Sequence, residues 1–287
     1  MSQNSYKAAL QWYLDNGVDD VLLNAPVNRT VAVPKITEAT TPAPGLSDMP
    51  QMDIAPAKSA PLQKTMALLG ASDARNEAVK LAQSASTLEE LRDAIKNFEG
   101  IQLKKTATNL VFSDGNPNAP IMIVGEAPGA DEDRIGKPFV GVSGQLLDKI
   151  LACIDLFRTE EDVGKAVYIS NILNWRPPGN RTPSPGEVEA SLPFIERHIQ
   201  LVKPKLIILA GGVSAKALLG SGDAISKLRT RWHDYTPQTP ELAANATPIP
   251  TLATYHPSYL LRTPSQKKLV WADMLMVQAK RRELGLL

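Results

Sequence analysis

Two short segments hold the residues of this sequence that are best suited to chemistry. Glu126 stands in the segment Gly-Glu-Ala-Pro-Gly that ends at Gly129, and His256 begins the segment His-Pro-Ser-Tyr-Leu-Leu-Arg that ends at Arg262. Carboxylate and imidazole groups act as general acids and bases, and they stabilise charge that develops during a reaction. Together the two segments outline a candidate active site.

The candidate side chains follow apolar runs that are typical of buried strands. One such run precedes Glu126, a second precedes Asn171 and a third precedes His256, while Phe139 lies in the segment after Glu126. In open α/β sheets, ligands bind in the crevice beyond the carboxyl ends of the strands. We therefore expect a carboxylate, an amide, an imidazole and an exposed aromatic ring to line one pocket. Such a pocket suits a planar, hydrogen-bonding ligand such as a nucleobase.

Each of these residues also has an ordinary structural interpretation. Asn171 is of a type favoured at caps and turns, His256 suits a buried structural histidine, and Phe139 suits a core position. The glycines around Glu126 are also compatible with a common strand-to-helix turn. The occurrence of these residues at successive strand ends favours the functional interpretation.

From residue 119 onward, strand-like runs alternate with helical patterns. This alternation is typical of βα units around a mainly parallel sheet, so we expect an α/β fold. The expected strands are residues 121–124, 167–169, 206–210 and 249–253, and the expected helices are residues 143–154, 185–202, 213–219 and 264–284. Pro185 after Ser184 suits the first turn of the second of these helices.

The chain divides by composition into three parts. These are an amphipathic helix within residues 1–25, a disordered linker rich in Pro, Ala and Thr over residues 26–61, and a domain over residues 62–287. Helical patterns open the domain at residues 62–83 and 87–98, and Thr87 followed by Glu90 predicts a capping box. We expect the N-terminal helix either to dock back or to bind a protein partner through Trp12 and Tyr13.

The composition restricts the class of protein. The 287 residues are 43% hydrophobic with a mean hydropathy of -0.15, which is typical of a soluble protein. The sequence has no apolar stretch of membrane-spanning length and no secretory signal pattern, so we expect a cytoplasmic location. With a net charge of +1, nucleic-acid binding requires local clustering of basic residues. Candidates for such a cluster are Arg262, Lys267, Lys268, Lys280, Arg281 and Arg282.

Three segments resemble, in the same order, motifs of the family 4 uracil-DNA glycosylases. The first extends from Gly125 past Phe139 to Asp148, the second joins Ser170-Asn171-Ile172 to Arg176-Pro177-Pro178, and the third begins at His256. Ordered agreement over residues 103–275 is far more specific than a single glycine pattern. The resemblance implies a three-layer α/β/α fold with a central, mainly parallel four-stranded sheet. It also implies a monofunctional enzyme that releases uracil from DNA during base excision repair.

The resemblance implies roles for the candidate residues. Glu126 would activate water and stabilise the cationic sugar, and His256 would donate a hydrogen bond to uracil as negative charge develops on it. Asn171 would read the base edge, which differs between uracil and cytosine, and Phe139 would stack on the ring. The other expected uracil-binding positions are Ala127 and Gly129.

A base within a duplex must be flipped out to reach such a pocket. Leu260 and Leu261 would then fill the vacated stack, and Arg262 would hold a flanking phosphate. The segment that contains Glu132 would shape the pocket by crowding the position of the thymine methyl group. Further expected contacts to phosphates are Ser258, Arg176, Arg181, Arg229 and Arg231.

Members of this family usually carry an iron–sulfur cluster on four cysteines. This chain has one cysteine, Cys153, and it lies outside the cluster positions. Those positions hold Phe98, Ile101, Trp175 and Ser191. We therefore expect hydrophobic packing in place of the cluster, and no metal or other cofactor.

The sequence leaves alternatives open. Loss of the cluster is compatible with a non-catalytic protein that binds uracil or single-stranded DNA, although Glu126 and His256 are both present. Relatives that capture uracil covalently require a basic insert ending in histidine, which residues 134–137 lack. A nucleotide-binding α/β protein predicts a glycine loop opening directly into a helix, whereas we expect a loop over residues 130–142. The expected substrate is uracil-containing DNA, single- or double-stranded, and the expected form is a monomer.

Overall fold

The computed structural model describes residues 71–244 and 246–287. The elements expected within residues 1–25 and 26–61, and the start of the helix expected over residues 62–83, lie outside the described residues. The first described helix is α2 (Ala71–Ser84).

The next helix is α3 (Leu88–Asn97). The Thr87 hydroxyl accepts a hydrogen bond from the Glu90 N–H at 3.1 Å. The Glu90 carboxylate accepts from the N–H of Ser86 rather than that of Thr87, so only half of the expected capping box forms.

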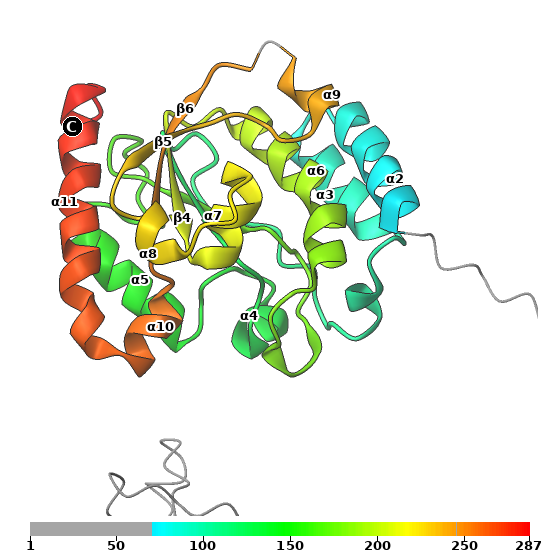
Figure 1. Cartoon of the computed structure of the whole chain (residues 1–287), viewed down its shortest axis with the longest axis horizontal. Coiled ribbons are helices and arrows are strands. Elements are labelled where there is room, and N and C mark those ends of the chain that lie inside the picture. Colours follow the sequence, from blue (N-terminus) through cyan, green and yellow to red (C-terminus); the bar gives the residue numbers. More distant parts are fainter. Residues whose placement is uncertain (1–70, 245) are drawn as a thin grey trace, which may run out of the picture. The chain divides into compact units, whose positions relative to one another are not determined.

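A sheet forms the centre of the described chain (Figure 1). It has six strands, in the order β1-β3-β2-β4-β6-β5. Its four inner strands pair in parallel, as expected: β3 (Tyr168–Asn171), β2 (Ile121–Gly125), β4 (Leu206–Ala210) and β6 (Ile249–Thr254). Two short antiparallel strands that the sequence pattern did not predict flank them: β1 (Asp114–Gly115) and β5 (Trp232–Tyr235). Every residue of β2 is buried, which explains its continuous apolar sequence.

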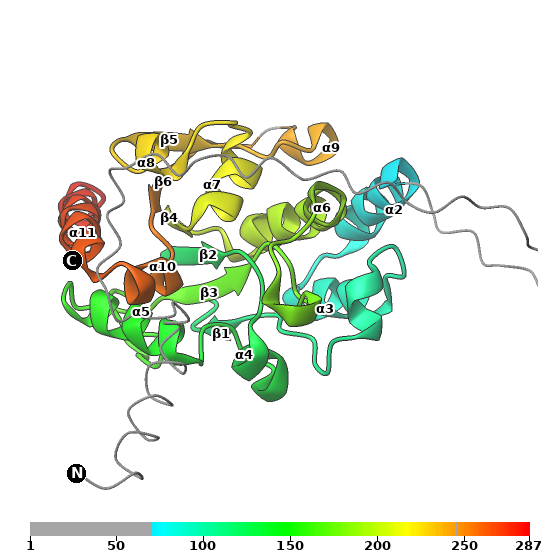
Figure 2. The same ribbon diagram turned by 60° about the horizontal axis from the view of Figure 1, so that its bottom comes forward.

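Helices cover both faces of this sheet (Figure 2). One face carries α2, α3, α6 (Pro185–Val202) and α7 (Gly212–Leu219). The other carries α5 (Val142–Ala152), α10 (Pro257–Arg262) and α11 (Lys267–Glu283). Along β2, Met122 and Val124 enter the core on the first face, while Ile121 and Ile123 enter the core on the second. The expected three-layer α/β/α fold is confirmed.

The ends of α6 follow the local rules that predicted them. The Ser184 hydroxyl accepts from the Glu187 N–H at 3.3 Å, and the Glu187 carboxylate accepts from the Ser184 N–H at 2.7 Å. Pro185 occupies the first turn, and Lys203 ends the helix in the left-handed region with φ 54°.

The remaining elements are shorter than the sequence pattern can reveal. They are α4 (Ala130–Ile135), α8 (Ile225–Leu228), α9 (Pro240–Ala243), η1 (Gln102–Lys105), η2 (Pro178–Asn180) and η3 (Pro264–Gln266). The expectation of a loop over residues 130–142 is wrong in its first half, because α4 begins directly after Gly129. Most residues of α4 are charged, so it has no apolar period to detect. A glycine loop that opens directly into a helix was the feature expected of a nucleotide-binding protein. Because Gly129 opens into α4, this feature no longer distinguishes a nucleotide-binding protein from a uracil-DNA glycosylase.

The expected basic cluster does not form one surface patch. Arg281 is only 1% exposed and donates hydrogen bonds to the carbonyls of Ile154 and Gly164. Lys280 pairs with Glu283 at 2.7 Å. Lys267 and Arg282 lie near opposite ends of α11, which spans roughly 25 Å at about 1.5 Å per residue.

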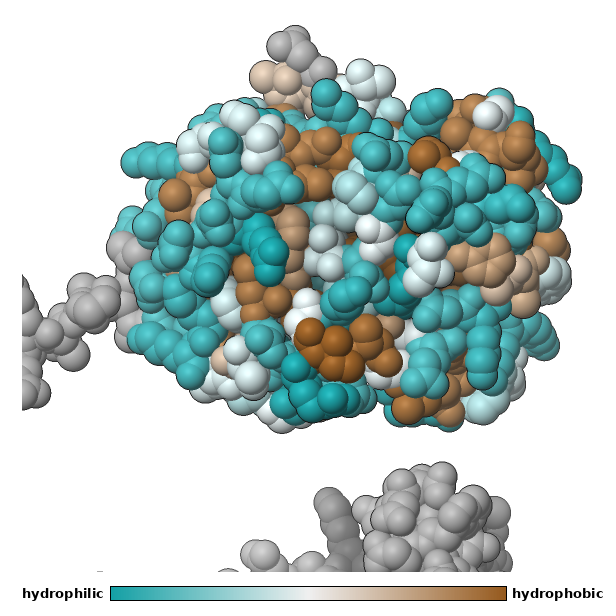
Figure 3. All heavy atoms as spheres, turned by 180° about the vertical axis from the view of Figure 1, so that it is seen from behind, coloured by the Kyte–Doolittle hydropathy of each residue, from teal (hydrophilic) through white to brown (hydrophobic). Residues whose placement is uncertain are grey.

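The surface seen from behind is largely polar, with apolar patches that are separated from one another (Figure 3). No helix in the part of the chain that the structure describes is both long and apolar enough to cross a membrane.

Candidate active site

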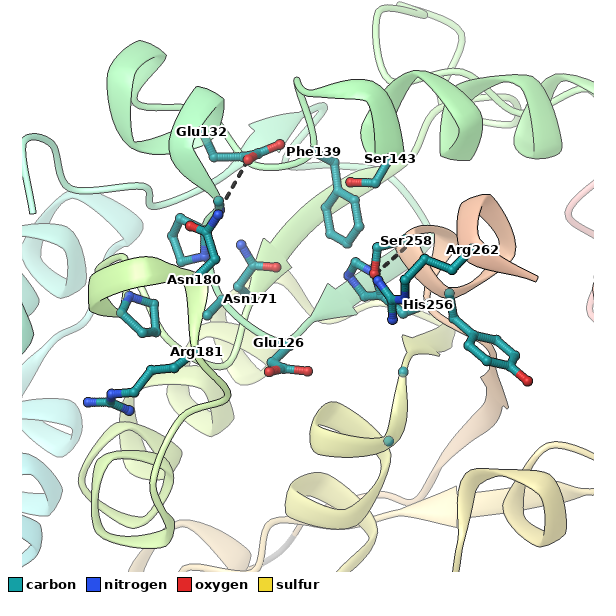
Figure 4. A pocket seen from close by; sticks show the side chains of 17 residues that line it. Glu126, Glu132, Phe139, Ser143, Asn171, Asn180, Arg181, His256, Ser258 and Arg262 are labelled. Carbon is teal, nitrogen blue, oxygen red and sulfur yellow. Dashed lines mark hydrogen bonds between the residues drawn. The ribbon is translucent and has the colours of Figure 1, made fainter. Parts of the chain in front are cut away.

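A cavity of about 420 Å³ opens beyond the carboxyl ends of the parallel strands. Glu126 follows β2, Asn171 ends β3, and His256 follows β6. Figure 4 shows these three side chains and Phe139 around one space. The structure thus brings together the four residues that the sequence singled out.

Parallel pairing brings the strand ends into register. Gly125 lies opposite Asn171 across the β2–β3 pair. A Cβ atom at Gly125 would lie 2.3 Å from Asn171 Oδ1 and 2.6 Å from the Phe139 ring. Only glycine therefore lets the Asn171 amide and the Phe139 ring approach β2 this closely. Asn171 is 2% exposed, so its amide is held in a largely dry site.

Glu126 is partly buried at the edge of the cavity. Burial raises the pKa of its carboxyl above the ordinary value of 4.5. Among the described residues, its carboxylate has no hydrogen-bond or ion-pair partner, and burial is the one cause of this pKa shift. Its side chain lines the cavity, where the carboxyl group can act on a ligand.

His256 is held by the start of α10. Its Nδ1 accepts a hydrogen bond from the Ser258 N–H at 3.2 Å and lies 2.8 Å from Ser258 Oγ. Burial, followed by the charge of Arg262, lowers the pKa of His256 to about 4, so the ring is neutral at neutral pH. Because Nδ1 is an acceptor, the hydrogen-bond network assigns the single ring proton to Nε2. His256 can therefore donate a hydrogen bond without carrying a charge.

Phe139 is not the exposed ring that the sequence suggested. It is 4% exposed, and its ring stacks on His256 with centroids 5.4 Å apart and planes at 27°. Its backbone lies in the left-handed region with φ 54°, which is unfavourable for a side chain of this size. A Cβ atom at Gly144 would come within 1.9 Å of the Phe139 carbonyl oxygen, so α5 can pack against this turn only through a glycine.

Two oppositely charged side chains hold the Phe139 turn, and we call this pair the Phe139 clamp. The Glu132 carboxylate accepts hydrogen bonds from the N–H groups of Val140 and Gly141, both at 2.9 Å. The Arg158 guanidinium donates to the carbonyls of Pro138 at 2.9 Å and Phe139 at 2.8 Å. The clamp therefore satisfies the polar backbone groups of an unfavourable turn, which fixes the ring beside His256.

Glu132 also accepts a hydrogen bond from the Gly129 N–H at 3.0 Å, which joins the first candidate segment to the clamp. Sequence reasoning missed Arg158, because nothing near it in the chain resembles a motif. Its guanidinium is held in turn by Asp148 at 2.8 Å and Asp114 at 3.3 Å.

The structure separates the residues that were expected to wedge into DNA. Leu260 is fully buried in the core beneath α10, so the prediction that it fills the vacated stack is wrong. Leu261, its neighbour on the helix, is 42% exposed and remains available. Ser258 and Arg262 line the cavity, as do the residues from Ala127 to Gly129.

Of the arginines that were expected to contact phosphates, some are accessible and others are held by acidic side chains. Arg181 lines the cavity but forms a double hydrogen bond with Glu187 at 2.8 and 2.6 Å, which lowers the pKa of Glu187 to about 2. Arg176 bonds Asn180 at 2.8 Å and does not line the cavity. Arg229 is 6% exposed and paired with Asp273 at 2.7 Å, so the expectation that it contacts a phosphate is wrong. Arg231 is 63% exposed.

The residues at the family's usual cluster positions do not fit an iron–sulfur cluster. Phe98, Ile101 and Trp175 belong to one hydrophobic core, and the Phe98 ring meets the edge of Phe194 at 5.1 Å. Ser191 is also buried, and its hydroxyl has no hydrogen-bond partner within the described chain. None of these side chains is a thiolate, the ligand that such clusters require. Within the described ranges, no group of three or more His, Cys, Asp or Glu side chains is arranged to hold a metal ion.

Comparison with known proteins places this geometry in a family. The model of the uracil DNA glycosylase superfamily matches residues 112–275. A type-4 uracil-DNA glycosylase of Pyrobaculum aerophilum is 36% identical over 189 residues, which cover 66% of this chain and 92% of the relative. Proteins of the same description from Sulfurisphaera tokodaii and Archaeoglobus fulgidus are 33% and 34% identical, with 84% and 87% of their lengths covered. This chain therefore belongs to the uracil DNA glycosylase superfamily.

Proposed function

We propose that this protein is a uracil-DNA glycosylase that hydrolyses the bond between uracil and deoxyribose and leaves an abasic site for base excision repair. The observation that carries the proposal is the joint placement of Glu126, Asn171, Phe139 and His256 in one cavity. The curated relatives described as type-4 uracil-DNA glycosylases support the same reaction.

Cleavage of this bond builds positive charge on the sugar and negative charge on the departing base. Glu126 suits the first charge, because an unpaired carboxylate in a partly buried site stabilises a cation more strongly than it would in water. The same carboxylate can orient and activate the attacking water. Glu126 is thus the proposed base and electrostatic stabiliser.

His256 suits the charge on the base. Its neutral ring offers an Nε2–H donor, and the hydrogen bonds from Ser258 fix that tautomer before substrate arrives. In the proposed reaction, Nε2–H donates to a uracil carbonyl oxygen, and the bond strengthens as the oxygen gains negative charge.

Asn171 and Phe139 account for recognition of the base. The Asn171 carbonyl accepts from uracil N3–H while its amide donates to a ring carbonyl, whereas cytosine presents the reverse pattern. A mismatch would leave buried polar groups unpaired, at roughly 1–3 kcal/mol for each group. The Phe139 clamp holds the ring on which the base stacks.

Contacts outside the pocket hold the DNA strand. Leu261 is the proposed wedge, and Ser258 and Arg262 contact phosphates beside the flipped nucleotide. Arg181 can join them only by sharing its charge with Glu187. We propose that the protein needs no cofactor and acts as a monomer in the cytoplasm.

Replacement of Glu126 by Gln should abolish uracil release while binding is retained. The amide keeps the size of the side chain but removes its charge, so kcat should fall by at least about 100-fold. The measurement is alkali-induced strand cleavage of an oligonucleotide that contains one uracil. A wild-type protein that binds this oligonucleotide tightly but never cleaves it would instead identify a non-catalytic reader.

The pH dependence should show one acidic limb, which belongs to Glu126. Activity needs the ionised carboxylate, so kcat/KM should fall as the pH drops through a midpoint above 4.5, the ordinary pKa of Glu. His256, with a pKa of about 4, should add no limb near 6.5. The profile is measured for the wild type and for His256→Gln, and a limb near 6.5 that disappears in the variant would contradict this assignment.

Disruption of the Phe139 clamp should lower activity because the Phe139 ring would no longer be held in position. Arg158→Met should lower kcat/KM about tenfold, because misplacement of a binding group is costly even without a lost contact to substrate. In a Phe139→Leu background, the same change should have less than about a twofold effect. Arg134→Met, which removes an exposed arginine from α4, is the control. Equal losses in both backgrounds would show that Arg158 acts only on stability.

Purified protein should contain far less than one equivalent of iron and of acid-labile sulfide. Ser191→Ala should keep full activity and gain up to about 1 kcal/mol of stability, because the buried hydroxyl has no partner. Stoichiometric iron, or loss of activity on treatment with a chelator, would overturn the proposal of a cluster-free enzyme.

A further inference from the structure

A second cavity adjoins the active-site cavity and has no role in the chemistry proposed above. It has a volume of about 360 Å³ and shares Gly211, Gly212, His256 and Tyr259 with the active-site cavity. Its remaining lining residues are Tyr255, Ile225 and Ser226, which come from the segment between β6 and α10 and from α8. We call this cavity the tyrosine groove.

The tyrosine groove is lined mainly by apolar and aromatic surface. The rings of Tyr255 and Tyr259 lie 5.0 Å apart with planes at 47°, and both residues are partly exposed. Ile225, from α8, also lines the groove. Apart from the two tyrosines, the lining residues with polar side chains are Ser226 and His256. A flat ligand with aromatic faces fits this surface better than a charged or strongly polar one.

The Tyr255 ring is fixed from behind by a buried ion pair. The Arg229 guanidinium lies 5.0 Å from the centre of the ring, and Asp273 holds that guanidinium by two hydrogen bonds of 3.1 and 2.7 Å. Asp273 also accepts a hydrogen bond from Thr254 Oγ1 at 2.7 Å, which ties the pair to the end of β6. The ring is therefore held in place before any ligand binds, so binding loses little entropy on its account.

Cations lie in the active-site cavity and on or just after α8, the helix that supplies Ile225 and Ser226 to the groove. Arg262 lines the active-site cavity, and Lys227, directly after Ser226, has a side chain that is 74% exposed. Arg231 is 63% exposed. The acidic neighbour of these last two is Asp223, which lies 4.0 Å from each of them. Arg262 in the active-site cavity and the exposed Lys227 on α8 suit the phosphates of a strand that passes from the first cavity to the second.

We propose that the tyrosine groove binds the nucleobase next to the flipped-out uracil in the same DNA strand. This inference rests on the proposed function. The two cavities share His256 and Tyr259, so they are close enough to be occupied by consecutive nucleotides. The neighbouring base packs on the tyrosine rings and Ile225, and stacking of this kind accepts any base. A base in the groove has left its own stack and pair, so the groove contributes most with single-stranded DNA.

The test compares three single-stranded oligonucleotides that each contain one uracil. One has ordinary neighbours, one has an abasic tetrahydrofuran residue on the 5′ side of the uracil, and one has it on the 3′ side. KM and kcat for uracil release are measured with the wild type, and Kd is measured by fluorescence anisotropy in the Glu126→Gln background. The variants are Tyr255→Leu, which changes the groove without touching the active-site cavity, and Ile225→Ala. Leu275→Ala, at an exposed apolar position of α11 outside both cavities, is the control.

With the wild type, the abasic residue on one side should raise KM and Kd about tenfold, within the range for loss of one base stack. Tyr255→Leu should raise both values by a similar factor for the ordinary oligonucleotide, and should have no further effect on the oligonucleotide that lacks the base on that side. Ile225→Ala should show the same pattern with a smaller change, and Leu275→Ala should match the wild type.

Two results would overturn the proposal. The first is that the wild type shows the same KM and Kd for all three oligonucleotides, so that an abasic residue has no effect on the 5′ side or on the 3′ side. The second is a loss in Tyr255→Leu that is equal for all three oligonucleotides. If the wild type releases uracil from none of them, the proposed function fails, whereas the anisotropy measurements still decide whether the groove binds a neighbouring base.

Discussion

The parallel hydrogen bonding of β3, β2, β4 and β6 is the constraint on which the site depends. Parallel strands bring their carboxyl ends to one edge of the sheet, so Glu126, Asn171 and His256 meet although they are far apart in the chain. Because both faces of these strands are buried, a shift of one residue would exchange the side chains of the two cores. The packing that stabilises the sheet therefore also sets the positions of the candidate site residues.

A second constraint concerns the turn that contains Phe139, which lies outside the strands of the sheet. Phe139 lies on a turn with an unfavourable backbone conformation, and the sheet alone cannot hold it. Glu132 and Arg158 bind opposite sides of that turn, one through its N–H groups and the other through its carbonyls. Charged side chains thus serve here to shape an apolar surface, which explains why two ionisable residues near the pocket need no role in the reaction.

Burial at the strand ends shifts the pKa values of the two proposed catalytic groups in opposite directions, because it disfavours the charged form of each. It raises the pKa of Glu126 and lowers the pKa of His256 to about 4. The site thus pairs a carboxyl group with a neutral imidazole donor, which suit the positive and negative charges that the proposed reaction develops. Away from the site, Phe98, Ile101 and Trp175 belong to one hydrophobic core.

The sequence by itself determined the parallel core, the four central site residues and the family, because buried strands and ordered motifs are local patterns. It also gave the bounds of α6, whose capping residues are adjacent in the chain. The tertiary structure alone decided that Leu260 is buried while Leu261 is exposed, that Arg229 pairs with Asp273, and that Arg158 holds the Phe139 turn. These outcomes depend on which distant segments pack together, and neither residue type nor spacing along the chain contains that information.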